Sequence, residues 1–284
     1  SDTPKTETGV SMYDREAQEG KGAWISIDAW VFDVTYNDGI SCQVRVRKVN
    51  YTQSEASSLA KQYATMMGQI PACLRKGVSY VNLMKGDREW GGNSSTKALD
   101  IQIGKLSNEY QQKGIIEETL VHESCHAALD PLFYTKEDWM KSRKKDNTFI
   151  SQYAADNPER EDVAESFVPY LAVAYRPSRI SEEDFKKIKR SIPNRMKIFA
   201  DRNLEMLPFI SLDCKGSNNG ARVTFTSKQG SVIKLRVDWD EGATFVGKTN
   251  LNITNGVCED CPTLGGIDTK KNPRSATYIV RQTD

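Results

Sequence analysis

Apolar and polar residues alternate in the first part of the chain in the way typical of β-strands. Between residues 23 and 46 the apolar side chains recur at every second position, and an Asn-Asp-Gly sequence at 37–39 predicts a hairpin turn. Residues 78–84 and 98–103 predict two further strands. Between them, residues 85–96 are rich in Gly, Asn and Ser, and we expect a loop there.

The middle of the chain changes to the spacing of amphipathic helices. Ser54 is the predicted cap of a helix over 54–67, and apolar residues also recur at helical intervals over 115–129. An Asn-Pro pair at 157–158 predicts the start of another helix, because Pro is favoured at the first helical position. Ser181 predicts the cap of a third.

The pattern changes again after Pro208, where short β-type runs are separated by Gly, Asn and Lys. We therefore expect an α+β domain over 23–208 and a small β-rich C-terminal module over 209–284. Residues 1–22 carry few apolar side chains, so a flexible N-terminal tail is expected there.

Composition narrows the classes of function. In 284 residues, 39 Lys and Arg nearly balance 38 Asp and Glu, which argues against electrostatic binding of nucleic acid. No run approaches the ~18 consecutive apolar residues of a membrane span. Six cysteines and the glycosylation sequons at Asn50, Asn93 and Asn252 predict an oxidising compartment, as for a secreted glycoprotein.

The six cysteines predict two disulfides, one unassigned thiol in the C-terminal module and one buried thiol. Cys42 and Cys73 flank the first helical region and are expected to pair. Cys214 is expected to pair with one cysteine of the Cys-x-x-Cys sequence at 258–261, which lacks the further ligands that a zinc site needs. Cys125 is then a small buried residue.

The chemistry is concentrated in one motif, His122-Glu123-Ser124-Cys125-His126, which has the pattern HExxH inside a predicted helix. Residues four apart lie on one helical face, so both imidazoles can bind one metal ion. Glu123 would then lie where a carboxylate can take a proton from a water molecule. The motif predicts a zinc cofactor and a hydrolytic reaction.

A catalytic zinc ion normally has three protein ligands, and the chain contains only two histidines. The third ligand is therefore expected to be an acid (Asp130, Glu161, Asp162 or Glu165), with the Cys125 thiol as the lesser alternative. Asp130 lies on the same helix as the histidines, too close to reach an independent coordination position. The acids of the next helix are the better candidates, and the residues alone do not choose among them.

HExxH followed by the segment NPEREDVAESF resembles the gluzincin metallopeptidases, in particular the group of the anthrax lethal-factor peptidase domain and the Pro-Pro endopeptidases. The resemblance covers about residues 75–175 and implies a zincin-like domain, with a small twisted sheet above the active-site helices. It also implies that Glu161 is the third ligand and that Glu165 supports a ligating histidine. Tyr153 would stabilise the oxyanion.

We therefore expect a secreted zinc-dependent endopeptidase acting on a protein or peptide, with Glu123 as general base. An extended substrate could pair with the strand at 98–103 if that strand lies at the sheet edge; an interior position is the alternative. The competing hypothesis is a non-catalytic, zinc-bearing binding or adhesion protein that contacts a surface or a carbohydrate through the C-terminal module. Glu123 argues against it, because a structural zinc site has no use for a base.

Overall fold

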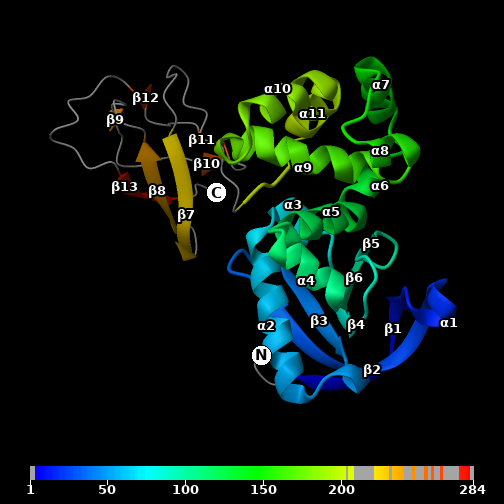
Figure 1. The fold of residues 1–284 in the computed structure, drawn as a ribbon. Coiled ribbons are helices and arrows are strands. Elements are labelled where there is room, and N and C mark those ends of the chain that lie inside the picture. The colour runs from blue at the N-terminus through cyan, green and yellow to red at the C-terminus, as the bar shows by residue number, and fades with distance from the viewer. Residues whose placement is uncertain are drawn as a thin grey trace.

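The computed structural model describes residues 4–202 and 204–207, and beyond them only the backbone of short strands between 221 and 281. The described residues form an α+β structure in which helices pack against one mixed sheet, with a group of helices above it in the view of Figure 1.

The sheet has six strands. Their spatial order is β1 (Lys5–Asp14), β2 (Ala23–Thr35), β3 (Ser41–Arg47), β4 (Tyr80–Lys85), β6 (Ala98–Ile103) and β5 (Gly91–Asn93). β3, β4 and β6 are parallel, and the other neighbours pair antiparallel. Strands β1 and β5 therefore form the two edges.

The first strand corrects the expectation of a flexible N-terminal tail. β1 pairs with β2 along most of its length, and Val10 and Met12 are buried against Ala29, Val31 and Met84. Only these two positions of β1 have buried apolar side chains, and its register shifts between Glu7 and Val10. A strand with one largely exposed face carries so few apolar residues that its composition resembles that of a tail.

Helix α2 (Gln53–Gln69) packs on the sheet through the predicted apolar face, with Ala60, Tyr63 and Met67 buried. Its cap is Thr52 and not Ser54: the Thr52 hydroxyl accepts from the Glu55 amide while the Glu55 carboxylate accepts from the Thr52 amide. This reciprocal pair satisfies two backbone N–H groups. A cap at Ser54, two residues later, would leave them without these hydrogen bonds.

Two short helices, α1 (Ala17–Gly20) and α3 (Ala72–Arg75), connect parts of the sheet layer. The sheet layer is completed by α4 (Lys105–Gln112) and α5 (Ile116–Ala128), the latter matching the helix expected over 115–129. Helix α5 contacts strands β5 and β6 as well as helix α9, so it lies between the sheet and the helical half (Figure 1).

The helical half contains α6 (Asp130–Phe133), α7 (Glu137–Asp146), α8 (Gln152–Asp156), α9 (Asp162–Tyr175), α10 (Glu182–Ser191) and α11 (Pro193–Asp201). Phe133, Trp139, Phe167 and Phe199 form a cluster of ring contacts that joins α6, α7, α9 and α11. Ser181 caps α10, as predicted, by accepting from the Asp184 amide. Helix α9 begins later than the Asn-Pro pair suggested, after a turn at 158–161.

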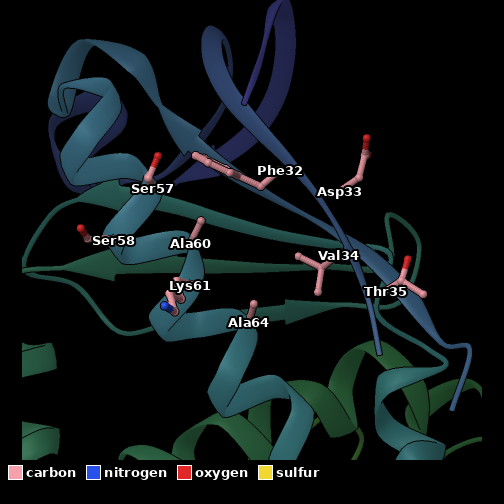
Figure 2. A pocket seen from close by; sticks show the side chains of 9 residues that line it. All are labelled: Phe32, Asp33, Val34, Thr35, Ser57, Ser58, Ala60, Lys61 and Ala64. Atoms are coloured by element: carbon pink, nitrogen blue, oxygen red, sulfur yellow. The ribbon is translucent and has the colours of Figure 1, made fainter. Parts of the chain in front are cut away.

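A hollow of about 450 Å³ lies between α2 and β2, beyond the point at Val31 where the pairing of β1 with β2 ends (Figure 2). Its floor is apolar, with Phe32, Val34 and Ala60. Asp33 and Lys61 are the ionisable residues of its lining, so it offers no imidazole or thiol to a metal ion.

The expected Cys42–Cys73 disulfide is wrong. Both are free thiols: the Cys42 sulfur lies 3.7 Å from the Tyr36 hydroxyl, and the Cys73 sulfur lies 3.8 Å from the Met206 sulfur. Each thiol is thus packed against a different part of the core. Cys125 is fully buried, as expected.

In the C-terminal region, β7 (Ala221–Gln229), β8 (Val232–Trp239) and β13 (Ser275–Arg281) form an antiparallel sheet in the order β13-β8-β7. Short pairs are formed by β9 (Phe245–Val246) with β12 (Thr263–Leu264), and by β10 (Ile253–Thr254) with β11 (Val257–Cys258). This agrees with the expected β character of 209–284. The proposed boundary near 208–213 and the disulfide of Cys214 lie outside the described residues.

Candidate metal centre

Helix α5 presents both histidines of the chain toward α9. Its first turn carries Glu117 and Glu118, which favour the positive end of the helix dipole. Leu120, Val121 and Cys125 are buried in the core and fix the rotation of the helix. His122 and His126 are then half-buried on the side that faces the start of α9.

Three ligand atoms converge at this point. The Nε2 atoms of His122 and His126 are 3.2 Å apart, and the Oε2 atom of Glu161 lies 3.2 Å from the first and 3.1 Å from the second. Zinc–ligand bonds of 2.0–2.1 Å in a tetrahedral arrangement would place ligand atoms about 3.3 Å apart. The spacing therefore fits a zinc ion.

The outer nitrogen of each imidazole meets an acid. His126 Nδ1 lies 2.8 Å from Asp130 Oδ2, and His122 Nδ1 lies 3.3 Å from Glu165 Oε1. A carboxylate holds the proton on Nδ1, so a neutral ring presents the lone pair of Nε2 to the shared point. Two such lone pairs and a carboxylate oxygen are three acceptors. Only a cation, either a proton or a metal ion, can bridge them.

The pKa values of Glu161 and His126 both indicate that this cluster attracts positive charge. Burial disfavours ionisation of Glu161, yet its hydrogen bonds with His122 and His126 hold its pKa well below the usual range. Burial lowers the pKa of His126, but the hydrogen bonds with Asp130 and Glu161 outweigh it and raise the pKa to about 10. The point where the three atoms meet thus attracts positive charge, for which a proton and a metal ion compete.

The segment between α7 and α9 supplies two further contacts. The Tyr153 hydroxyl donates to Glu161 Oε1 at 3.1 Å, and the side chain is 53% exposed, so it can also reach a bound substrate. Burial and the charge of Glu161 raise the pKa of Tyr153 and keep the phenol protonated. Ser151 caps α8 and donates to Glu165 Oε2 at 2.6 Å, which fixes the acid that holds His122.

Glu123 lies on α5 beside the cluster and is half-buried. Burial is the largest influence on the raised pKa values of Tyr110 and Tyr153, and the negative charge of Glu123 adds to both. Glu123 directly follows His122, so the helix carries the candidate base next to one of the candidate ligands.

The strand next to this helix is not the one expected. β6, at 98–103, is an interior strand between β4 and β5, and the edge strand β5 comes from the segment expected to be a loop. β5 contacts α5 directly: a Cβ atom on Gly92 would lie 1.9 Å from the carbonyl oxygen of Glu123. Only glycine permits this approach.

The structure thus brings the side chains of His122, His126, Glu161, Glu165 and Tyr153 together at one place, and Glu123 follows His122 on the same helix. Asp162 points elsewhere, toward Trp139 and Arg195. Two contributors had no role assigned from sequence. Asp130 was rejected as a ligand, although its spacing of four from His126 places the two side chains on one helical face. Ser151 has no sequence signal beyond that of a helix cap.

No protein-family model and no curated protein matches this chain. Within the part of the chain that the structure describes, no helix has the length and apolar character needed to cross a bilayer. The candidate metal centre is therefore the feature of this chain that bears on its function.

Proposed function

We propose that the chain is a secreted zinc-dependent endopeptidase with a zincin-like catalytic domain. The observation that carries the proposal is the convergence of two imidazole nitrogens and one carboxylate oxygen within 3.2 Å of one another, with Glu123 beside them. This donor set is the one that zinc hydrolases use when a position is left open for water or substrate.

When bound, zinc would polarise a peptide carbonyl and lower the pKa of a water molecule. The side chains would do the rest. Glu123 would take the proton of the attacking water and deliver it to the leaving amine. Tyr153, with its hydroxyl exposed, would donate a hydrogen bond to the oxygen that becomes negative in the transition state.

A peptide substrate is supported by the position of β5. This strand forms one edge of the sheet and lies against the helix that carries the histidines. An exposed strand edge offers backbone donors and acceptors to an extended chain, which can add to the sheet as a further strand. Such binding places a peptide bond beside Glu123 and does not require a particular sequence.

The test is digestion of an unbiased peptide library by the full chain, followed by mass spectrometry, together with measurement of bound zinc. Wild type should bind one zinc ion and cleave peptides. Glu123→Gln should keep the zinc and lose about 10³-fold in kcat, at the middle of the range for a general base. The matched control is Glu118→Gln, because Glu118 is an exposed acid on the same helix.

Cleavage by Glu123→Gln at the wild-type rate would contradict the role of general base, and the absence of zinc from wild type would contradict the proposal as a whole. A chain that binds zinc but cleaves nothing would favour the binding or adhesion protein acting through the C-terminal module.

A further inference from the structure

A buried ion cluster lies behind the metal centre, in the helical half. It consists of Arg195 near the start of α11, Asp146 at the end of α7 and Asp162 in the first turn of α9. All three side chains are 0% exposed. One guanidinium thus faces two carboxylates in the core. Burying such charges costs desolvation free energy, which only well-aligned ion pairs and hydrogen bonds offset.

Each of the three guanidinium nitrogens of Arg195 donates to a different residue. Its Nε atom donates to Asp146 Oδ2 at 3.0 Å, and Nη1 donates to Asp162 Oδ1. Nη2 donates to the carbonyl oxygen of Thr148. Asp146 in turn accepts from the backbone amides of Asn194 and Arg195, so it also fixes the start of α11.

Two of these bonds reach segments that form the metal centre. Asp162 directly follows Glu161, and its other oxygen accepts from the Trp139 indole at 3.1 Å, so the first turn of α9 is held from two sides. Thr148 begins the segment that leads to Ser151 and Tyr153. Arg195 therefore connects two segments of the site. One carries Glu161, and the other carries Ser151 and Tyr153, which bind Glu165 and Glu161.

We infer that Arg195 is a positioning residue for the metal centre: through Asp162 and Thr148 it sets the position of Glu161 relative to the two histidines. The inference rests on the proposed zinc site. Arginine suits this task because its planar fork can serve three acceptors in fixed directions, whereas the ammonium group of lysine is a single point of charge.

A purely structural role for the cluster would predict a different result. Loss of the guanidinium fork would then lower the stability of the whole domain and leave the affinity of folded protein for zinc unchanged. Zinc affinity is therefore the measurement that separates the two roles, and it requires a control that loses stability without touching the cluster.

The experiment compares Arg195→Lys with Phe199→Leu in the full chain. Phe199 lies one turn further along α11, is 1% exposed and makes ring contacts but none of the bonds of Arg195. The zinc dissociation constant is measured by competition with a chromophoric chelator, and thermal unfolding is followed for the metal-free proteins. The visible absorption spectrum of the Co²⁺-loaded proteins reports the geometry of the ligands.

Arg195→Lys should weaken zinc binding about tenfold, the lower end of the effect of an outer partner of a metal ligand. It should also change the Co²⁺ spectrum, whereas Phe199→Leu should lower the unfolding temperature and change neither. If Arg195→Lys does not fold, Asp162→Asn takes its place with the same expected outcome.

Equal zinc affinity and an unchanged Co²⁺ spectrum in the folded cluster variant would overturn the inference while leaving the zinc site intact. Failure of wild type to bind zinc is a different result, since it would overturn the proposed function and the inference with it.

Discussion

Two of the polar groups in this domain are arranged on opposite principles. One is the candidate metal centre of His122, His126 and Glu161. The other lies within the sheet, where Asp14 Oδ1 accepts from Gln102 at 3.2 Å and Asp14 Oδ2 accepts from Arg47 at 2.9 Å. In the same network, an oxygen of Asp100 accepts from Asn82 and from the backbone amide of Tyr13.

In the sheet network the carboxylates of Asp14 and Asp100 meet donors, while Asn82 Oδ1 and Arg47 Nε are buried without a hydrogen-bond partner. At the metal centre, three acceptors point at one position and are complete only when a cation is there. Burial alone therefore does not identify a binding site. What identifies it is convergence of lone pairs that the protein itself does not satisfy. This difference leads to predictions for four variants.

Removal of the third ligand should have the largest effect. Glu161→Ala should weaken zinc binding at least about 100-fold, more than the loss of an outer partner costs. Isothermal titration with zinc would measure this, with Glu159→Ala as the control, since Glu159 is an exposed acid of the preceding turn. An unchanged dissociation constant would move the ligand to Asp162 or Glu165.

Tyr153→Phe should lower kcat about 100-fold, the usual cost of losing one donor to the developing oxyanion. Zinc affinity should remain near that of wild type, because the tyrosine contacts Glu161 through the oxygen that does not face the histidines. Steady-state kinetics on a peptide substrate would test this beside Tyr134→Phe, a change at an exposed tyrosine that directly follows α6. Full activity would exclude Tyr153 from catalysis.

Asp130→Asn should weaken zinc binding by about tenfold, since the amide orients the His126 ring less strongly than the carboxylate does. Chelator competition would measure the change. If the zinc affinity stayed the same, the contact between Asp130 and His126 would have a structural role and would not support metal binding.

Asp100→Asn should have the smallest effect and should separate the two groups. Because the two are connected by no shared partner, the zinc dissociation constant should change by no more than about twofold, or roughly 0.5 kcal/mol. The asparagine oxygen can still accept from Asn82 and the Tyr13 amide. A larger change in zinc affinity would show that the sheet network and the metal centre act as one unit.

The same variant tests the sign of a pH effect. Burial raises the pKa of Asp100, so the folded state holds this proton more strongly than the unfolded chain, in which the pKa is about 3.9. The contribution of Asp100 to stability is therefore present below about pH 4 and is lost as pH rises through the folded-state pKa. Urea unfolding of wild type and Asp100→Asn at pH 4 and 7 should show the variant gaining in relative stability at the higher pH.

Local sequence predicted the elements whose signals are local. The helix over 115–129, the strand over 98–103 and the cap at Ser181 depend on periodicity and on a hydroxyl next to a helix start, and the structure has all three. HExxH identified the two histidines for the same reason, because spacing of four on a helix fixes relative position. The residues alone made Glu161 one of several candidate acids, and only the resemblance selected it.

The order of strands could not be obtained in this way. β1 and β5 are edge strands with few apolar residues, and their places depend on contacts with distant segments of the chain. The same holds for Arg195, which is more than 30 residues from Asp162 in sequence and looks like a surface residue until its two acids are seen beside it. The free thiols of Cys42 and Cys73 show that the number and spacing of cysteines do not predict a disulfide when their neighbours in space are unknown.

Gly92 has a consequence for how this protein could change its preferences. Since no side chain fits between β5 and the Glu123 carbonyl, the height of the strand above the helix is set by backbone atoms. In the proposed peptidase, a peptide added to β5 would be positioned by the main chain of Glu123, the proposed general base. The surrounding side chains could then be exchanged to select different substrates without displacing the point of cleavage, so that selectivity and bond placement can evolve separately.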